Sequence, residues 1–99
     1  MVIRTDQGER RPLVAGKPIR LTGHARQQLA FRGTSEHEIV EAIRTSAWQP
    51  AELGRLDCRK EFVFNAEWNG RWYATKQVRP IFVDAREEIV VVTVYVYYF

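Results

Sequence analysis

The sequence predicts an α+β domain in which two N-terminal helices, joined as an αα-hairpin, pack on one face of a curved antiparallel sheet of three to four strands. Two capped segments at residues 23–32 and 36–45 have helical patterns, and β-branched and aromatic residues dominate the chain from residue 59 onward. Ninety-nine residues leave room for one hydrophobic core. We therefore expect a flexible N-terminal arm over residues 1–18 and a single domain over residues 19–99.

Both predicted helices carry capping residues at their ends. Thr22 has the hydroxyl group of an N-cap residue, and Gly33 stands where a left-handed backbone commonly ends a helix. Ser35 and Glu38 form a capping box for the second helix. The turn between the helices is very short, so their apolar faces need a common partner. The final strand is the obvious candidate.

Asn69-Gly70 is the strongest hairpin signal in the sequence. It predicts a strand over residues 59–68 and a returning strand over residues 71–76. A bend or bulge is expected at Pro80 before residues 81–83, and a second turn at residues 84–87 leads into the final strand. Counting from the two turns predicts these pairs: Trp68 with Arg71, Ala66 with Tyr73, Phe64 with Thr75, Val83 with Glu88 and Lys76 with Tyr95. The last pair assumes no bulge at Pro80, because a bulge would shift the partners by one residue and exchange the two faces.

The final strand, residues 88–98, has two different faces. Val92, Val94 and Val96 suit a core beneath the helices. The opposite face is expected to meet water, a ligand or a partner, and it contains Asn65, Glu67, Trp72, Lys76, Val91, Thr93, Tyr95 and Tyr97. One edge of the final strand is free in this arrangement, and a long uncharged edge promotes aggregation. We expect the segment before Leu21, or a second copy of the chain, to pair with it.

Charge is distributed unevenly along the chain. The formal net charge is +3, and residues 1–32 contain seven Arg or Lys residues against two Asp or Glu. Arginine outnumbers lysine twelve to three. Arginine suits bidentate phosphate contacts, and an arginine-rich codon usage is the alternative explanation. One cysteine, no secretory signal and no apolar run of membrane-spanning length predict a cytoplasmic protein without membrane contact.

His24 is the first candidate for chemistry. It lies in the first turn of the first helix, where unpaired amides and the helix dipole attract anions, and a free histidine titrates near about 6.5. Arg26 and Arg32 on the same helix, and Lys76 beside Tyr95, are candidate phosphate contacts. Each has a structural alternative: a helix-capping histidine, a solvated helix face and a cross-strand pair. No His and Cys spacing predicts a metal site, and no motif predicts a cofactor.

Three short motifs follow one another along the chain: Thr22-Gly23-His24-Ala25, Arg32-Gly33-Thr34-Ser35 and Val92-Thr93-Val94-Tyr95. In these motifs the chain resembles a prokaryotic family, the domain of unknown function numbered 4258, over about residues 19–97. The resemblance implies the barnase/EndoU/colicin/RelE-like ribonuclease and toxin fold, with a nuclease-like site on the open face of the sheet.

The function that the resemblance implies is a metal-independent ribonuclease or RNA-binding domain of RelE-like toxin type. RNA supplies its own 2′-hydroxyl nucleophile, so the protein needs an acid, a base and cationic groups. This hypothesis assigns catalysis to His24, Lys76 and Tyr95, and substrate binding to Arg26, Arg32, Thr93 and Tyr97. The alternative is a non-catalytic interaction module, either a homodimer through the final strand or a toxin held by an antitoxin-like protein.

Overall fold

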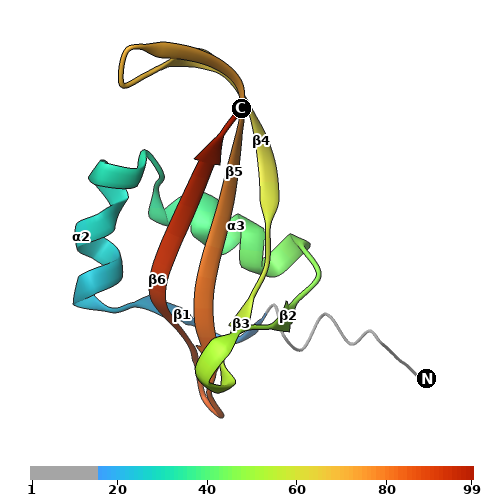
Figure 1. Cartoon of the computed structure of the whole chain (residues 1–99). Helices are drawn as coiled ribbons and strands as arrows, with labels where there is room; N and C mark the ends of the chain where they lie inside the picture. The colour runs from blue at the N-terminus through green and yellow to red at the C-terminus, as the bar shows by residue number, and fades with distance from the viewer. Residues whose placement is uncertain (1–15) are drawn as a thin grey trace.

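The computed structural model describes residues 16–99, which form two α-helices and a six-stranded mixed sheet (Figure 1). The strand order is β1-β6-β5-β3-β2, and β4 pairs with β5 on the same edge as β3. The elements in chain order are β1 (Ile19–Leu21), α2 (Gly23–Arg32), α3 (Glu36–Thr45), β2 (Gln49–Pro50), the 3-10 turn η1 (Glu52–Gly54), β3 (Leu56–Asp57), β4 (Lys60–Trp68), β5 (Arg71–Asp84) and β6 (Ile89–Tyr98).

Figure 1 shows how the layers are arranged. Helix α3 crosses behind β5, and α2 lies beside β6. Neither α2 nor α3 covers the face of the sheet that is turned toward the viewer. Residues 1–15, most of the predicted N-terminal arm, lie outside the described residues.

The prediction of an antiparallel sheet of three to four strands is wrong, because the sheet has six strands and one parallel pair. Strand β1 runs parallel to β6, with Ile19 opposite Ile89 and Leu21 opposite Val91. Strands β2 and β3 have two residues each. Strands of that length are too short to show an alternating pattern, so the sequence does not predict them.

The expectation that the segment before Leu21 pairs with the final strand is confirmed. Besides the β1 ladder, the Ile89 amide donates to the Pro18 carbonyl at 2.9 Å. Beyond β1, the Val94 amide donates to the side-chain oxygen of Gln28 in α2, also at 2.9 Å. A glutamine from the neighbouring helix thus satisfies a backbone donor on the strand edge that β1 does not reach. Pairing with a second copy stays a prediction.

The predicted helix caps are confirmed. The Thr22 hydroxyl accepts a hydrogen bond from the Ala25 amide, and Gly33 ends α2 with a φ angle of 78°. Ser35 accepts from the Glu38 amide and caps α3. The Glu38 carboxylate, however, contacts Lys76 and the Thr34 hydroxyl, so it is used to connect α3 to the sheet.

The hairpin at Asn69-Gly70 has the predicted pairs nearest the turn, Trp68 with Arg71 and Ala66 with Tyr73. The predicted pair of Phe64 with Thr75 is wrong, since Val63 lies opposite Thr75. A bulge between Val63 and Ala66 places one extra residue in β4, and Asn65 has a φ angle of 47° there. Asparagine tolerates this left-handed conformation better than most residues.

The register between β5 and β6 also differs from the prediction, in two places. The turn closes with Asp84 opposite Ile89, so the predicted pair of Val83 with Glu88 is wrong. A second shift follows between Ile81 and Phe82, where β6 contains an additional residue, Val92. Lys76 therefore lies opposite Tyr98 and not Tyr95.

Pro80 lies in a central strand, fully buried opposite Val94, and the predicted irregularity follows it directly, between Ile81 and Phe82. Thr75 and Phe99 exchange both backbone hydrogen bonds, which makes every second pair along this ladder, including Pro80 with Val94, a non-hydrogen-bonded pair. The nitrogen of Pro80 faces the edge of β5 that pairs with β3 and β4. On that edge Pro80 lies between Val78, which pairs with β4, and Ile81, which pairs with β3. The missing N–H group therefore breaks no ladder hydrogen bond.

The bulge at Val92 decides which side chains of β6 face the helices. Ile89, Val91 and Val94 are buried in the core, and Val96 packs against it. The prediction that Val91 and Lys76 lie on the open face is therefore wrong. Thr93, Tyr95 and Tyr97 lie on the open face as predicted. The buried core comprises Leu21, Ala25, Ile39, Ala42, Ile43, Cys58, Val78, Phe82, Ile89, Val91 and Val94.

No helix in the described part of the chain is long and apolar enough to cross a lipid bilayer.

The reactivity of the Cys58 thiol measures how well this core is shielded from solvent. Burial, helped by the neighbouring Asp57 carboxylate, raises the pKa of its thiol from 9.0 to about 12. The thiolate is the reactive form, so at pH 8 we expect iodoacetamide to modify the native protein at least roughly a hundredfold more slowly than the protein in urea. Because the folded-state pKa is raised, stability from the neutral thiol is complete below about pH 9 and is lost as pH rises through 12. Equal rates with and without urea would contradict this burial.

Candidate functional site

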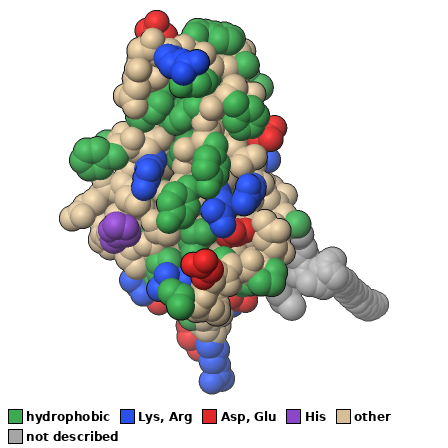
Figure 2. Space-filling model, in the orientation of Figure 1, with side chains coloured by type: hydrophobic (Ala, Val, Ile, Leu, Met, Phe, Trp, Pro, Cys, Tyr) green, Lys and Arg blue, Asp and Glu red, His purple; other side chains and the backbone are tan. Residues whose placement is uncertain are grey.

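Two tyrosines and two arginines meet on the open face of the sheet. Tyr95 and Tyr97 occupy alternate positions of β6 and are 39% and 40% exposed. The guanidinium carbon of Arg32, at the end of α2, lies 5.5 Å from the centre of the Tyr95 ring. That of Arg79, in β5, lies 5.7 Å from the same ring. In Figure 2 this face carries a central group of hydrophobic side chains flanked by Lys and Arg.

Asp57 holds Arg79 in place from beneath the surface. Its Oδ2 atom accepts from Nε of Arg79 at 3.0 Å and from Nη2 at 2.7 Å. Nη1 of Arg79 donates to the Tyr97 hydroxyl at 3.3 Å. The hydrogen bonds with Asp57 and Tyr97 raise the pKa of Arg79 above its ordinary value, so the guanidinium stays charged. Asp57 itself is only 2% exposed, and its Oδ1 has no hydrogen-bond partner within residues 16–99.

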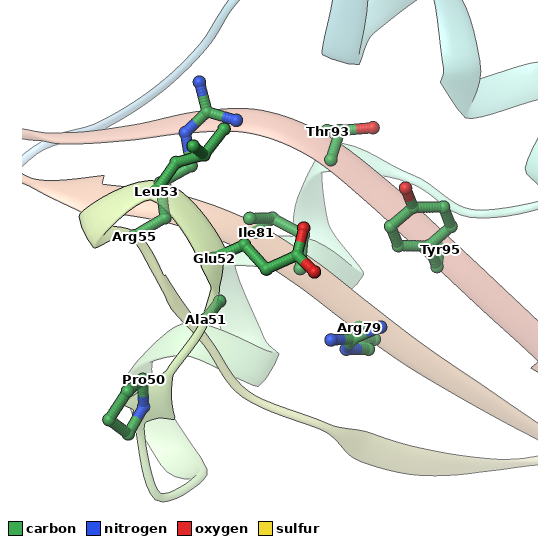
Figure 3. Close-up of a pocket in the computed structure, with 9 residues that line it drawn as sticks. All are labelled: Pro50, Ala51, Glu52, Leu53, Arg55, Arg79, Ile81, Thr93 and Tyr95. Atoms are coloured by element: carbon green, nitrogen blue, oxygen red, sulfur yellow. The ribbon is translucent and has the colours of Figure 1, made fainter.

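A cleft of about 540 Å³ adjoins the Tyr95 ring (Figure 3). Its floor and one wall come from β5 and β6, and its other wall comes from the β2–η1–β3 segment. The lining residues are Pro50, Ala51, Glu52, Leu53, Arg55, Arg79, Ile81, Thr93 and Tyr95. The volume lies in the range of about 300–1,000 Å³ that is typical of small-molecule sites.

The rim of the cleft carries unpaired charges and a strained residue. Within the described residues, neither the Glu52 carboxylate nor the Arg55 guanidinium forms a hydrogen bond or an ion pair. Leu53 has a φ angle of 61° and is 83% exposed. A leucine in the left-handed region costs roughly 1–2 kcal/mol, and such strain is commonly kept where a loop has to present particular side chains.

His24 lies on the same side of α2 as Gln28 and Arg32, because these residues are spaced four apart. Gln28 contacts β6, since its side-chain oxygen accepts from the Thr93 hydroxyl at 2.8 Å. His24 is exposed, about 12 Å from Arg32 along the helix axis by the rise of 1.5 Å per residue. It therefore lies at the margin of the open face, away from the tyrosines.

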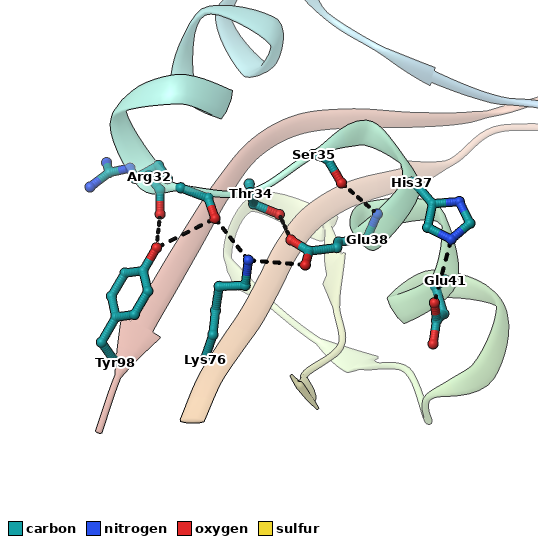
Figure 4. Close-up of polar contacts among 9 residues, drawn as sticks. Arg32, Thr34, Ser35, His37, Glu38, Glu41, Lys76 and Tyr98 are labelled. Atoms are coloured by element: carbon teal, nitrogen blue, oxygen red, sulfur yellow. Dashed lines mark hydrogen bonds and ion pairs between the residues drawn. The ribbon is translucent and has the colours of Figure 1, made fainter. Parts of the chain in front are cut away.

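Lys76 is separated from both His24 and Tyr95. It is buried on the helix side of the sheet, where its Nζ atom lies 2.9 Å from Oε2 of Glu38 and donates to the Gly33 carbonyl at 3.0 Å (Figure 4). Figure 4 shows the Arg32 side chain pointing away from this group. Lys76 holds the α2–α3 turn against β5, so the structure does not bring His24, Lys76 and Tyr95 together in one site.

The remaining predicted substrate residues have other partners. Arg26 forms an ion pair with Glu36 at 3.0 Å, and the carboxylate of Glu36 offsets the positive charge of Arg26. Thr93 lines the cleft and bonds Gln28. Tyr97 accepts from Arg79 and lies beside the cleft. The structure therefore places Arg32, Thr93, Tyr95 and Tyr97 close together, with Arg26 apart.

The sequence reasoning missed Arg79, Glu52, Arg55 and Asp57. Arg79 lies opposite Tyr95 in the true register, but the predicted register placed Lys76 there. The other three belong to the segment between α3 and β4, for which the sequence predicts neither a helix nor a strand. The combination of charged residues with Pro50 and Gly54 in that segment was the only signal available.

Comparison of the chain with protein-family models, with curated proteins and with solved structures found no match in any of the three. The resemblance to the domain of unknown function therefore stays a prediction. Residues 16–99 also contain no group of three or more His, Cys, Asp or Glu side chains that could hold a metal ion.

Proposed function

We propose that this protein binds single-stranded RNA on the open face of its sheet. Of the two functions expected for a RelE-like domain, RNA cleavage and RNA binding, the proposal takes RNA binding. The observation that carries the proposal is the Tyr95 ring with Arg32 and Arg79 near it, at the mouth of a cleft of about 540 Å³. Half-exposed aromatic rings give unpaired bases a surface to stack on, and arginines beside them contact the phosphates.

The arginines around the tyrosines have two different roles. Arg32 and Arg55 have no acidic partner among residues 16–99, so both guanidinium groups are available for phosphate oxygens. Arg79 is already bonded to Asp57, which orients it beside the Tyr95 ring. A strand of RNA would thus meet the Tyr95 ring together with the two guanidinium groups that lie over it.

The test is fluorescence anisotropy with short, labelled single-stranded RNA of mixed sequence. Tyr95→Ala removes a stacking surface worth roughly 1–3 kcal/mol per base, so affinity is expected to fall roughly 5- to 100-fold. Arg32→Ala is expected to weaken binding and to lower the slope of log K against log salt by about 0.7, because one phosphate contact is lost.

Arg86→Ala is the matched control for Arg32→Ala. Arg86 is exposed in the β5–β6 turn, and its replacement changes the net charge by the same amount. Affinity should fall clearly more for Arg32→Ala than for Arg86→Ala. Equal losses would show that net charge alone attracts the RNA, and unchanged affinity of Tyr95→Ala would overturn the stacking surface.

We extend the proposal to cleavage of the bound RNA, with His24 as the base. His24 lies in the same row of α2 as Arg32, and an imidazole can take the proton of a 2′-hydroxyl without a metal. The decisive assay incubates the wild type and His24→Ala with RNA in EDTA. Cleavage by the wild type alone assigns the reaction to His24. Equal cleavage by both, or none by either, rejects His24 catalysis and leaves a binding protein.

One observation favours the alternative interaction module. Strand β4 pairs only with β5 in the described chain, and Val63 and Trp72 in this hairpin are 85% and 62% exposed. An open strand edge with exposed apolar side chains is a common site of association. Light scattering after size exclusion distinguishes the two functions: a stable dimer that Trp72→Glu dissociates, without RNA binding, would favour the module.

A further inference from the structure

We propose that the cleft beside Tyr95 binds a free α-amino acid with a large apolar side chain. In this arrangement Glu52 binds the ammonium group of the ligand, Arg55 binds its carboxylate and Leu53 covers its side chain. The inference goes beyond RNA binding and does not depend on it, since Arg55 can meet the carboxylate of an amino acid in the same way as a phosphate oxygen.

Leu53 occupies a position in the β2–β3 hairpin for which leucine is poorly suited. Leu53 and Gly54 have φ angles of 61° and 72°, and the Arg55 amide donates to the Glu52 carbonyl at 3.1 Å. These features define a type I′ turn, in which Asn-Gly, Asp-Gly and Gly-Gly are preferred. The leucine is strained there, and its side chain is also 83% exposed. A residue that is both strained and exposed does not stabilise the fold, which indicates that its side chain serves a contact with a ligand.

Two charges of opposite sign flank this turn. Glu52 and Arg55 are its first and fourth residues, and the Cα atoms of such residues lie less than about 7 Å apart. Both side chains line the cleft, yet no ion pair joins them, and neither has another partner among residues 16–99. A ligand with only negative groups would be repelled by Glu52, and a ligand with only positive groups would be repelled by Arg55. An ammonium and a carboxylate attached to the same carbon atom satisfy both side chains at once.

The rest of the cleft is largely apolar. Its apolar lining comprises Pro50, Ala51, Leu53, Ile81 and the ring of Tyr95 (Figure 3). Small-molecule sites commonly combine such walls with a few charged groups that fix the orientation of the ligand. A leucine or phenylalanine ligand would bury its side chain against these walls, whereas glycine would leave them uncovered.

Isothermal titration calorimetry with L-leucine and L-phenylalanine tests the site, and three analogues test its contacts one by one. N-acetyl-leucine lacks the ammonium group, leucinamide lacks the carboxylate and glycine lacks the side chain. Wild type is expected to bind leucine or phenylalanine at least roughly tenfold more tightly than any of the three, because each analogue leaves one part of the site without a partner.

Glu52→Gln should remove the discrimination against N-acetyl-leucine, because the amide no longer attracts an ammonium group. Its control is Glu87→Gln, exposed in the β5–β6 turn, which changes the net charge equally and should keep the discrimination. Arg55→Ala should likewise remove the discrimination against leucinamide. Arg86→Ala, in the same β5–β6 turn, is its control and should keep it.

Leu53→Asn distinguishes a ligand contact from a structural role. Asparagine fits the first central position of a type I′ turn, so the thermal midpoint is expected to rise by roughly 2–6 °C. Binding of leucine should at the same time weaken at least roughly fivefold, because the apolar cover is lost. A leucine with only a structural role would lower the midpoint when it is replaced and would leave the ligand affinity unchanged.

Three results would overturn the amino-acid site: no binding of leucine or phenylalanine by the wild type, equal binding of leucine and its two derivatives, or unchanged affinity in Leu53→Asn. RNA binding is measured separately by anisotropy. Its absence would overturn the proposed function and leave the amino-acid site standing.

Discussion

Gly33→Ala is expected to lower the free energy of unfolding by about 2–5 kcal/mol. A Cβ atom at this position would lie 2.1 Å from the Tyr98 hydroxyl and 2.8 Å from the Trp68 ring. Overpacking of this kind costs roughly 1–3 kcal/mol. The φ angle of +78° adds roughly 1–2 kcal/mol for any residue with a side chain. Tyr98 lies this close to Gly33 because its hydroxyl donates a hydrogen bond to the Arg32 carbonyl at 2.7 Å.

Urea unfolding followed by tryptophan fluorescence measures this effect, and Gly70→Ala is the matched control. Gly70 has a φ angle of +85°, but a Cβ there would meet no atom within 4 Å. Gly70→Ala should therefore cost only the backbone part, about 1–2 kcal/mol. The difference between the two variants isolates the contact of the α2–α3 turn with Tyr98 and Trp68. Equal losses for both variants would show that the turn does not pack against these rings.

Arg79→Met is expected to destabilise the protein by about 3–5 kcal/mol and to reduce RNA binding at the same time. The substitution keeps much of the side-chain volume but leaves the Asp57 carboxylate buried without its cation. Breaking one side of a buried ion pair costs about this much, since the remaining charge is neither solvated nor paired. The loss is expected although Arg79 itself is partly exposed, because the buried partner is Asp57.

A second substitution separates the two effects of Arg79. Asp57→Asn combined with Arg79→Met removes the unpaired charge, so the double variant should be more stable than Arg79→Met alone in the same urea titration. RNA affinity should stay low in the double variant, because the guanidinium beside Tyr95 is still missing. A double variant no more stable than Arg79→Met would contradict the ion-pair explanation. Recovered RNA affinity would contradict the role of Arg79 in the site.

The helices show what local sequence determines. Thr22, Gly33 and Ser35 cap them as predicted, because a cap depends on a few consecutive residues and their own hydrogen bonds. The Asn69-Gly70 turn belongs to the same class, and it set the register of β4 and β5 correctly for the two pairs nearest the turn.

Pairing farther from the turns was not determined in this way. One extra residue in β4 and one in β6 displaced the predicted partners, and the β5–β6 turn closed at a different pair. A single displacement turns a side chain to the other face of the sheet, which is why Lys76 is buried under the α2–α3 turn while Arg79 stands beside Tyr95. Each bulge depends on packing between strands that are distant in the sequence.

The sequence by itself determined the two capped helices, the Asn69-Gly70 hairpin and the identity of the tyrosine face of the last strand. Only the tertiary structure decided which cations accompany that face and that the segment from Pro50 to Arg55 closes a cleft over it. The physical reason is the range of the interactions. Caps and tight turns are settled within a few residues, whereas a site made from α2, η1, β5 and β6 exists only once register, bulges and edge pairing have been fixed by the whole core.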